Sequence, residues 1–473
     1  MVNRNKILRA MRNIVGAEFV ETDELAIRLY SKEASGIESK ALAVVFPKIS
    51  KEVSEILRFA YAENLKIYPQ GSATGLAGAS TPSPDGIILS FDRMNTVKEI
   101  SIVDGFVVVE PGVRIIHLNE ELSKYGYHFP VDPASAKSAT VGGLINTGGG
   151  GLKGVVYGTM REWVMELEIV LPDEEGSILK IGCKTPKCRQ GYDLVRLIVG
   201  SEGTLAVVTE ATLRIYPQPE NVAVIVGFFD DMENVMKTVV EIKKKRISPA
   251  ILEFADAETV KIGAERTQLG VRGNMLIVGI EVPLEISEKY LRALEDIFKN
   301  NNANKILIAE TMAKAEEMKL FEIRRAAYPA AIFEASKEIE SELSRPLVVI
   351  EDIAVPPSKL PETVRKLRAL ANEYSFPLVL FGHVGDGNLH PTSWVDTSNE
   401  KMKSKFWEFL HKIMQIAIDL GGTISAEHGI GTLKKKGLEM EFEKKGSLKA
   451  LEIMRSIKKI FDPKNILNPG KIF

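Results

Sequence analysis

The sequence is poor in the features that mark several large classes of protein. Among its 473 residues only Cys183 and Cys188 are cysteines, which argues for a reducing compartment and against a disulfide scaffold or a cysteine-bound iron–sulfur cluster. No apolar run approaches the ~20 residues that span a bilayer, and the polar start MVNRNKILRAMRN lacks the apolar core of a signal peptide. We therefore expect a soluble cytoplasmic enzyme, with peripheral docking at a membrane left open.

The sequence also lacks a large excess of charge of one sign. The 61 basic and 63 acidic residues leave a net charge of −2, and no long run carries a single sign. Charge therefore predicts neither nucleic acid nor an anionic membrane surface as a partner. The chain exceeds the ~250 to 300 residues at which a single core stops growing, so we expect two or three domains.

Two short motifs hold three of the six histidines: FGHVGDGNLHP at 381–391 and GGTISAEHGIG at 421–431. Within the first motif, Asp386-Gly387 is a strong signal for a hairpin with a two-residue turn. Such a turn would pair His383 with His390 and place their Cβ atoms about 4.5 to 5.5 Å apart on one face. The two imidazoles would then converge as they do in a metal site.

The second motif supplies a third ligand and a base. Zinc, manganese or iron bound by two imidazoles needs at least one more protein ligand, for which Glu427 is the candidate. Neighbouring side chains on an extended backbone point to opposite sides, so His428 would face away from the metal. A neutral imidazole beside a cation suits a general base. The alternative is that these histidines are ordinary core or loop residues.

A glycine-rich loop, PQGSATGLAGAS at 69–80, follows a predicted β-α-β unit. The unit consists of a strand at 42–46, a helix that Ser50 caps and that runs to about residue 64, and a strand at 65–68. Such a loop can bring several main-chain N–H groups to an anion, but it lacks the Lys-Ser/Thr end of a triphosphate-binding loop. An ordinary flexible turn is the alternative.

A second glycine-rich stretch, ATVGGLINTGGGGLKGVVYG, covers residues 139–158. Residues 130–138 do not form a predicted strand, so the Rossmann interpretation of the GGGG run is rejected. Residues 97–111 read as a hairpin that turns at Asp104-Gly105, and further short strands follow. Short strands around two glycine loops predict an α+β domain whose main-chain amides bind a diphosphate.

Six segments together resemble one known family. They are residues 71–78, residues 140–151, GSEGTL at 200–205, GHVGDGNLH at 382–390, AEHGIG at 426–431 and the terminal ILNPGKIF. From about residue 38 to its end, the chain is similar to the FAD-linked 2-hydroxy-acid dehydrogenases of the vanillyl-alcohol oxidase superfamily. This group includes D-lactate dehydrogenase, D-2-hydroxyglutarate dehydrogenase and the glycolate oxidase flavoprotein subunit.

The resemblance implies an α+β fold with a two-part FAD-binding domain of the vanillyl-alcohol oxidase type. It places an N-terminal helical lead-in at 1–37, the FAD-binding domain at 38–217, a substrate or cap domain at 218–420 and a C-terminal helical segment that returns to the FAD domain at 421–473. The β-α-β-β-α-β order of residues 222–309 agrees with a ferredoxin-like antiparallel cap.

The resemblance also implies the residues that bind FAD. Most are glycines or small residues of the two glycine-rich stretches: Pro69, Gly71, Ser72, Ala73, Thr74, Gly75, Leu76 and Gly78 at the diphosphate; Pro133, Thr140, Gly142, Gly143, Asn146, Thr147, Gly148 and Gly149 near the ribityl chain and ring; Gly203 and Val207 at the adenine end; and Asn468 near the ring. The diphosphate loop has no His or Cys, so we expect noncovalent flavin. Gln70 and Ala73 stand where relatives often have Arg and Gly, and helix packing is an alternative role for Gly142 and Gly143.

For the chemistry, the resemblance implies His383, His390 and Glu427 as ligands of a divalent metal and His428 as the catalytic base. Arg324 resembles the arginine that binds the substrate carboxylate, although Arg325 beside it leaves the register open, and Tyr328 would present a hydroxyl. The implied reaction oxidises a small D-2-hydroxy acid, with D-lactate favoured, to the 2-oxo acid. Hydride passes to flavin N5, and the electrons pass to a non-NAD acceptor such as a quinone, an electron-transfer flavoprotein or a dye.

Alternatives remain open at this point. The substrate could be D-2-hydroxyglutarate or glycolate, and Lys337 is one candidate for the cation that a second carboxylate needs. The protein could also be a non-redox flavoenzyme of the same fold, or a metal-binding hydrolase or binding protein. Glu351 and Asp352 could support the histidines, although a salt-bridged strand end is favoured, and Tyr192 is expected in the core. Metal identity, electron acceptor and a homodimer are not decided by the sequence.

Overall fold

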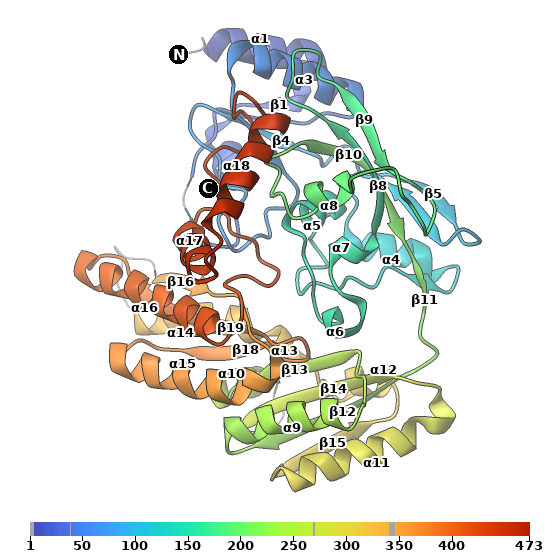
Figure 1. Cartoon of the computed structure of the whole chain (residues 1–473), viewed down its shortest axis with the longest axis vertical. Helices are drawn as coiled ribbons and strands as arrows, with labels where there is room; N and C mark the ends of the chain where they lie inside the picture. Colours follow the sequence, from blue (N-terminus) through green and yellow to red (C-terminus); the bar gives the residue numbers. More distant parts are fainter. Residues whose placement is uncertain (1–3, 38, 268–269, 340–345) are drawn as a thin grey trace. The chain divides into compact units, whose positions relative to one another are not determined.

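The computed structural model describes residues 4–37, 39–267, 270–339 and 346–473, which fall into two compact units. The first unit is built from residues 1–150, 159–218 and 427–473, and the second from residues 151–158 and 219–426. Figure 1 colours the chain by sequence, and its red C-terminal helices α17 and α18 belong to the same unit as the blue helix α1. The first unit therefore depends on segments from both ends of the sequence.

A small sheet in the first unit has the strand order β1-β2-β4-β3. Strands β2 and β3 both run parallel to β4, as a β-α-β unit requires, and β1 is antiparallel to β2. The bounds are β1 Val20–Glu21, β2 Ala43–Val45, β3 Ile67–Gln70 and β4 Ile87–Ser90, with helices α1 Arg4–Val15, α2 Glu24–Tyr30 and α3 Ser50–Glu63 and the 3-10 turn Ala17–Phe19. The loop of residues 71–80 thus begins at the carboxyl end of a parallel strand, where α/β sheets commonly bind ligands.

Helices α1 and α3 bury one side each in a core that they share with this sheet. Ile7 and Met11 keep the spacing of one helix face, as the sequence pattern predicts. The predicted cap of α3 is wrong. Ser50 is the first helical residue, Ile49 occupies the capping position, and the Ser50 hydroxyl donates to Glu168 Oε1 over 2.5 Å instead.

A five-stranded antiparallel sheet, ordered β5-β6-β10-β8-β9, completes the first unit together with a two-stranded sheet of β7 and β11. The predicted hairpin of residues 97–111 is confirmed as β5 and β6. The strands are β5 Val97–Ser101, β6 Phe106–Val109, β7 Tyr127–His128, β8 Val164–Val170, β9 Ile178–Gly182, β10 Val207–Arg214 and β11 Tyr216–Pro217, and the helices are α4 Ile115–Ser123, α5 Val141–Thr147, α7 Met160–Trp163, α8 Leu194–Ile198, α17 Lys435–Lys444 and α18 Leu448–Phe461. No strand occupies residues 130–138 before α5, in agreement with rejection of a Rossmann fingerprint.

The second unit contains one large antiparallel sheet. Its first four strands lie in the order β15-β12-β14-β13, which is the ferredoxin-like arrangement predicted from the sequence, with α10 inserted between β13 and β14. Strands β18, β19 and β16 extend the sheet beyond β13, and β17 pairs with β19. The strands are β12 Val222–Phe229, β13 Ile251–Ala255, β14 Asn274–Glu281, β15 Lys305–Ala309, β16 Pro346–Ile350, β17 Ile353–Ala354, β18 Val379–His383 and β19 Asn388–Asp396. The helices are α6 Gly154–Tyr157, α9 Met232–Lys244, α10 Ala257–Thr267, α11 Leu284–Asn300, α12 Met312–Glu317, α13 Glu322–Arg325, α14 Ala327–Glu338, α15 Leu360–Tyr374 and α16 Glu400–Asp419, with the 3-10 turn Pro357–Lys359.

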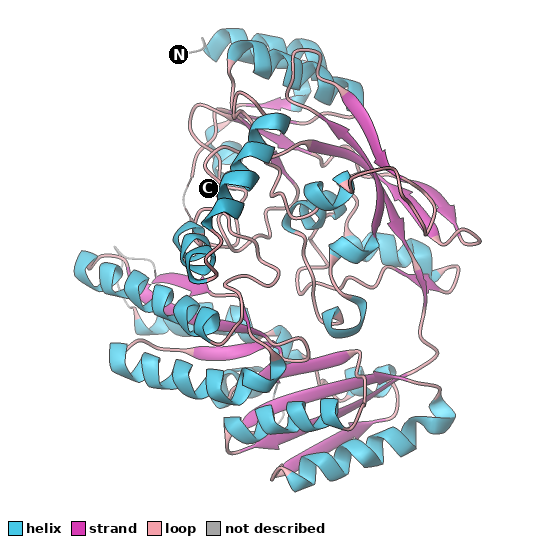
Figure 2. Cartoon of the chain, in the orientation of Figure 1, coloured by secondary structure: helices cyan, strands magenta, loops and turns pink. Residues whose placement is uncertain are grey.

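One face of this sheet carries the largest hydrophobic core. Helices α9, α11, α15 and α16 contribute to it, and Figure 2 shows them as cyan coils beside the magenta strands. Leu252 and Leu389 point into this core. Because side chains alternate along a strand, their neighbours Glu253 and His390 point to the opposite face, as does His383 in β18. The predicted site residues of this unit therefore gather on the face away from its main core.

The β18–β19 hairpin differs in register from the sequence prediction. Phe381 rather than His383 is opposite His390, and residues 384–387 form a four-residue turn. The predicted type I′ turn needs positive φ at both central positions, and only Gly387 has it, at 90°. The register differs by two residues, and an even shift keeps both imidazoles on one face of the sheet.

Two expectations about the segment between β9 and α8 are wrong. Cys183 and Cys188 form a disulfide, against the expectation drawn from the low cysteine count. Tyr192, which was expected in the core, has 95% of its surface exposed. Residues 183–193 contain no helix or strand that would bury one side of the segment. In the part of the chain that the structure describes, no helix is both long and apolar enough to cross a bilayer.

Candidate active site

A buried carboxylate in the second unit holds two of the predicted site residues. Glu253 is fully buried; its Oε1 lies 2.6 Å from Nδ1 of His383, and its Oε2 lies 2.8 Å from Nε of Arg324. The pairing of β13 with β18 sets this contact, because Glu253 lies directly opposite His383. A carboxylate accepts hydrogen bonds, so Nδ1 of His383 is the donor to Glu253, and in a neutral imidazole Nε2 then carries the lone pair.

The two predicted histidine ligands lie side by side. The ring centroids of His383 and His390 are 5.2 Å apart, with the ring planes at 87°. Both side chains are buried, and Phe381 packs beside them, with its ring 5.6 Å from that of His390 and 4.9 Å from Cζ of Arg324. The imidazoles therefore converge as predicted, although His383 and His390 are diagonal neighbours in the hairpin and not a directly opposed pair.

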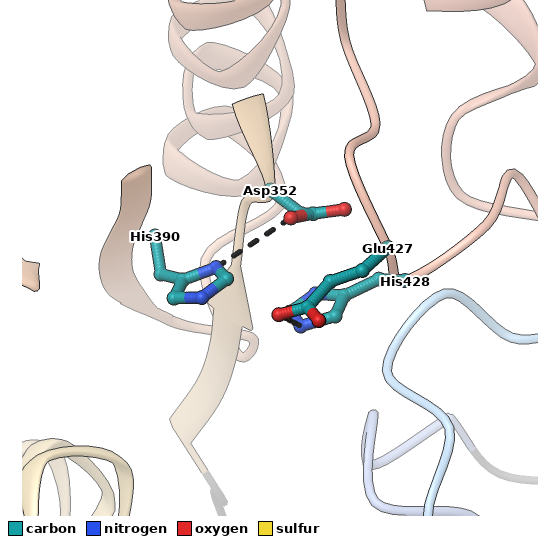
Figure 3. A group of neighbouring side chains, drawn as sticks. All are labelled: Asp352, His390, Glu427 and His428. Atoms are coloured by element: carbon teal, nitrogen blue, oxygen red, sulfur yellow. Dashed lines mark ion pairs between the residues drawn. The ribbon is translucent and has the colours of Figure 1, made fainter. Parts of the chain in front are cut away.

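Asp352 is a buried partner of His390, and Figure 3 shows this pair. Its Oδ1 lies 3.6 Å from Nδ1 of the histidine. Asn388 donates to Oδ1 over 2.8 Å, while the Ser425 hydroxyl and the Ala426 N–H donate to Oδ2 over 3.0 and 2.9 Å. Asp352 thus supports a predicted ligand, in contrast to the salt-bridged strand end that the sequence favoured. It also fixes the main chain at Ala426, the residue directly before Glu427.

The structure distinguishes the two adjacent arginines. Arg324 is 7% exposed and faces Glu253, whereas Arg325 is exposed and pairs with Glu316 at 2.7 Å and Glu322 at 3.0 Å. Tyr328 lies four residues after Arg324, at the start of α14, and burial raises its pKa to about 12. Tyr328 is therefore a neutral phenol at physiological pH, and its hydroxyl can donate a hydrogen bond.

In the first unit, a pocket of about 270 Å³ of empty space collects predicted cofactor residues from both glycine-rich stretches. Its lining residues are Pro69, Gln70, Gly71, Phe91, Pro111, Thr140, Gly142, Gly143, Asn146 and Val208. Close packing explains two of the glycines. A Cβ on Gly71 would lie 2.2 Å from Oγ1 of Thr140, and one on Gly142 would lie 2.6 Å from Pro111. Gly142 therefore packs against Pro111 and also lines the pocket.

The loop of residues 71–80 is held at one end by a carboxylate. Glu33 accepts the N–H groups of Gly78 and Ser80 over 2.5 and 2.7 Å. At the other end, the Ser72 hydroxyl donates to the carbonyl of Ser138 over 2.6 Å, and Ala73 has a φ of 50°. Within the described chain, the main-chain N–H groups of residues 72–76, which include Thr74, Gly75 and Leu76, donate no hydrogen bond. These donors fit an anionic group such as a diphosphate.

Two asparagines provide a second indication of a ligand. The side chain of Asn468 donates to the carbonyls of Ala79 and Glu202 over 2.9 and 2.6 Å. Its Oδ1 and that of Asn146 are buried without a hydrogen-bond partner among the described residues. Buried polar atoms are normally satisfied, so both oxygens are suited to donors of a bound molecule.

The turn that carries Glu427 and His428 rests on Glu202. The carboxylate of Glu202 accepts the N–H groups of Ile430 and Gly431 over 2.6 and 2.8 Å, and its burial raises its pKa to about 7 against the lowering effect of these two bonds. Glu427 and His428 do not point to opposite sides as predicted, because Oε1 and Nε2 lie 4.0 Å apart (Figure 3). The reason is that this segment turns, with Gly429 at a φ of 83°, instead of running as an extended strand.

Glu427 also lies against the second glycine-rich stretch. A Cβ on Gly150 would be 2.9 Å from Oε2 of Glu427 and 3.4 Å from Thr159. A larger residue at position 150 would therefore displace the carboxylate of Glu427. Within the first unit, the predicted metal ligand and the predicted flavin-contacting segment are neighbours.

The remaining predicted cofactor residues lie around this pocket or behind it. Thr147 and Gly148 end α5, and Gly149 follows them. A Cβ on Gly203 would approach Asn146 and Pro69 at 3.3 and 3.5 Å. Pro133 accepts the N–H of Ala136 in the segment before α5. Val207 is buried in the core of the first unit, and its neighbour Val208 lines the pocket because side chains alternate along β10.

Sequence reasoning missed Glu253 and the pocket residues Phe91 and Pro111. A signal for Glu253 was present, since a lone acidic residue interrupts the apolar run ILEFA at 251–255. A buried strand accepts a carboxylate only where that carboxylate is paired. The two pocket residues carry no comparable signal, because Phe and Pro are common in structural roles.

Comparison with known proteins places both parts of the chain in one family. Residues 41–182 match the FAD binding domain, and residues 218–472 match the C-terminal domain of FAD linked oxidases. The D-lactate dehydrogenase of Archaeoglobus fulgidus is 37% identical over 431 residues, which cover 91% of this chain and 90% of the relative. The glycolate oxidase subunit GlcD of Bacillus subtilis is 35% identical over 464 residues, with coverage of 97% and 95%. The D-2-hydroxyglutarate dehydrogenase of Stutzerimonas stutzeri is 30% identical over 480 residues, with coverage of 99% and 98%.

Solved structures with the same fold have much lower sequence identity. The 4-ethylphenol oxidase of Gulosibacter chungangensis aligns with a TM-score of 0.78 at 17% identity, over 100% of this chain and 97% of that one. Alkyldihydroxyacetonephosphate synthase aligns with a TM-score of 0.74 at 18% identity, over 98% of this chain and 85% of that one. These likenesses establish the fold alone.

Proposed function

The chain belongs to the family of FAD linked oxidases, and we propose that it oxidises a small D-2-hydroxy acid, with D-lactate favoured, to the 2-oxo acid. The observation that carries this proposal is the buried group of Arg324, Glu253 and His383 on one face of the sheet of the second unit. Arg324 and His383 lie on the two oxygens of this single carboxylate, which supports a cation for a substrate carboxylate beside an imidazole for a metal. A 2-hydroxy acid presents complementary groups, a carboxylate beside a hydroxyl.

Arg324 would bind the substrate carboxylate. Its Nε faces Glu253, so the guanidinium plane is fixed at one edge, and Phe381 packs beside it. A planar guanidinium with a fixed orientation can hold a carboxylate through two parallel hydrogen bonds, which sets the direction of the bond to the oxidised carbon. Tyr328, whose phenol is neutral at physiological pH and whose pKa burial raises further to about 12, would donate a hydrogen bond to a substrate oxygen.

His383, His390 and Glu427 would hold a divalent metal such as zinc, manganese or iron. The donor set of two imidazoles and one carboxylate fits these ions and leaves room for a substrate oxygen. The hydrogen bond of Glu253 to Nδ1 of His383 would leave Nε2 of that ring for the metal, while Asp352 lies 3.6 Å from Nδ1 of His390. When bound, such a metal acts as a Lewis acid that lowers the pKa of a coordinated hydroxyl.

His428 would accept the proton of the substrate hydroxyl as the general base. Glu202 holds its turn through the N–H groups of Ile430 and Gly431, so the imidazole is carried on a fixed main chain. Glu427, the proposed metal ligand, lies beside it, with Oε1 4.0 Å from Nε2, so base and metal would act on the same substrate hydroxyl.

FAD would be bound noncovalently by the residues around the first-unit pocket. The free N–H groups of residues 72–76 would bind the diphosphate, and the unsatisfied oxygens of Asn146 and Asn468 would accept hydrogen bonds. When bound, FAD would supply the hydride acceptor for the oxidation. The electrons would then pass to a non-NAD acceptor, a quinone, an electron-transfer flavoprotein or a dye in the assay.

The test begins with the absorbance spectrum of the purified protein. We expect a flavin spectrum that bleaches on anaerobic addition of D-lactate and persists with L-lactate. Bleaching by neither lactate nor by glycolate and D-2-hydroxyglutarate, with flavin bound, would favour a non-redox flavoenzyme of the same fold. A colourless protein that FAD cannot reconstitute would overturn the proposal. His383→Ala should remove both metal and turnover while FAD stays bound, and full activity in metal-free protein would refute the role of the metal.

Glycolate and D-2-hydroxyglutarate remain the second candidates, because similar relatives carry these names. A dicarboxylate needs a second cation near Arg324. Lys337 does not offer one on its own, since it is an exposed residue that pairs with Glu334 at 2.8 Å. A panel of D-2-hydroxy acids, scored by the rate of flavin bleaching, would rank the three substrates.

A further inference from the structure

The disulfide between β9 and α8 takes no part in the reaction proposed above. Cys183 directly follows β9, Cys188 is five residues further on, and their Cα atoms are 6.1 Å apart. Cys188 is exposed, and Cys183 is half-buried. Thiol–disulfide exchange requires an external thiolate to reach one sulfur of the pair, and Cys188 offers that access.

The loop around this disulfide is rich in positive charge. Lys184, Lys187 and Arg189 flank the two cysteines, and Lys187 and Arg189 are exposed. Lys184 is held near the loop base by an ion pair with Glu99 at 2.8 Å. Cations beside a cysteine favour its thiolate, which is both the nucleophile and the better leaving group in exchange. The local charge therefore favours a reactive pair over an inert structural one.

The disulfide lies at the base of α8. Gly182, next to Cys183, has a φ of 89°, and a Cβ at this glycine would lie 2.8 Å from Cγ2 of Val195 in α8. Asp193 caps α8 by accepting the N–H of Arg196 over 3.0 Å. Cys183 thus directly follows the residue of β9 that touches α8, and residues 189–193 connect Cys188 to α8.

The far end of α8 leads into the proposed FAD pocket. Gly200 and Glu202 donate their N–H groups to the carbonyls of Ile145 and Asn146, over 2.8 and 2.7 Å. Asn146 lines the pocket. A displacement of α8 would therefore reach the last turn of α5 through two main-chain hydrogen bonds.

We propose that Cys183 and Cys188 form a thiol–disulfide exchange site whose redox state sets the affinity for FAD. The co-substrate is a dithiol, either a small molecule or a thiol–disulfide oxidoreductase. Its thiolate attacks Sγ of Cys188 and forms a mixed disulfide, and Sγ of Cys183 leaves as a thiolate that takes up a proton. The second thiolate of the dithiol then releases Cys188. Two electrons reach the cysteine pair, and the dithiol becomes a disulfide.

Reduction opens the ring of residues 183–188 and frees the connection to α8, so we expect weaker FAD binding in the reduced protein. Coupling through packed elements typically changes an affinity by about two- to thirtyfold, and we expect about a fivefold rise in the FAD dissociation constant. The argument rests on FAD binding, which family membership supports, and is independent of the substrate proposed above.

The first experiment counts thiols in the native holoprotein. The protein is equilibrated in buffers with different ratios of reduced to oxidised dithiothreitol, and free thiols are trapped with a maleimide polymer and counted by gel shift. We expect zero modified cysteines in the most oxidising buffer, two in the most reducing buffer and a single transition between them. Cys183→Ser, which keeps the exposed sulfur, should form a mixed disulfide with oxidised glutathione and release one reduced glutathione. Cysteines that stay paired, or stay reduced, across all native buffers would overturn the proposal.

The second experiment measures the FAD dissociation constant by flavin fluorescence in both redox states. The matched control is the double variant Cys183→Ser/Cys188→Ser, whose affinity should not respond to dithiothreitol. Equal affinities in the oxidised and reduced wild type would overturn the proposed coupling, whatever the thiol count. Neither measurement uses a hydroxy acid, so failure of the oxidase assignment leaves both results interpretable.

Discussion

Removing the carboxylate of Glu253 should destabilise the second unit more than removing any exposed acidic side chain. In Glu253→Ala the guanidinium of Arg324, which is 7% exposed, stays buried and loses its ion pair of 2.8 Å. Breaking a buried pair by removing one partner costs about 3–5 kcal/mol, because the remaining charge is left uncompensated. The donor at Nδ1 of His383 loses its acceptor in the same change. We therefore expect a loss of roughly 4 kcal/mol in the free energy of unfolding.

A matched control is available at Arg325, the residue directly after Arg324. Glu316→Ala removes the partner of Arg325, whose ion pair of 2.7 Å is exposed on both sides. Exposed pairs contribute about 0–1 kcal/mol, so this variant should unfold close to the wild type. Glu253→Leu combined with Arg324→Leu should recover part of the loss, because it removes both charges together.

The assay is hydrogen–deuterium exchange of peptides from β13 and β18, followed as urea is raised. This measurement reports the opening of the sheet of the second unit and does not depend on flavin. If Glu253→Ala proved no less stable than Glu316→Ala, the buried pair would not stabilise the sheet, and the reasoning would be refuted. Glu253→Gln should also lower metal affinity about 10- to 100-fold while FAD stays bound, since the carboxylate orients a ligand.

Three further predictions concern the two sites. Gly71→Ala should weaken FAD binding about tenfold in a fluorescence titration, because the new methyl group would meet a threonine hydroxyl at 2.2 Å, whereas Gly270→Ala meets open space and should leave the affinity unchanged. The pKa of Glu202 is raised to about 7 by burial, so the folded protein keeps a proton that the unfolded chain loses. The free energy of unfolding should therefore fall by roughly 3 kcal/mol as pH rises from ~4.5 to ~7, and Glu202→Gln should flatten this slope in urea unfolding. Arg324→Lys should raise KM for D-lactate at least about tenfold by loss of the bidentate contact, and a normal KM, or an equal effect of Arg325→Lys, would contradict the assignment.

Local patterns in the sequence were sufficient for much of the fold. The hairpin of residues 97–111 and the order β-α-β-β-α-β in residues 222–309 depend on turn residues and on periodicity, which lie close together in sequence. The motifs also identified six of the ten residues that line the first-unit pocket. These features were predictable because neighbouring residues determine them.

Features that depend on distant residues were not predictable in the same way. Glu253 and His383 are 130 positions apart, and only the pairing of β13 with β18 brings them together. The register of the β18–β19 hairpin was misjudged because Asp386 does not take the positive φ that a two-residue turn requires. The exposure of Tyr192 likewise depends on a loop that packs against little else, which residue type alone does not reveal.

The assembly of the first unit from separated segments has a consequence for protein synthesis. Residue 67 accepts a main-chain hydrogen bond from residue 468, and Lys471 donates to Thr81. The first unit therefore lacks part of its structure until the ribosome has synthesised residues 468 and 471. The second unit consists almost entirely of residues 219–426 and can reach its native contacts while translation continues. The vitamin-derived cofactor should therefore join the polypeptide only after residues 468 and 471 have been synthesised, and nascent chains stalled before residue 468 should remain without flavin fluorescence.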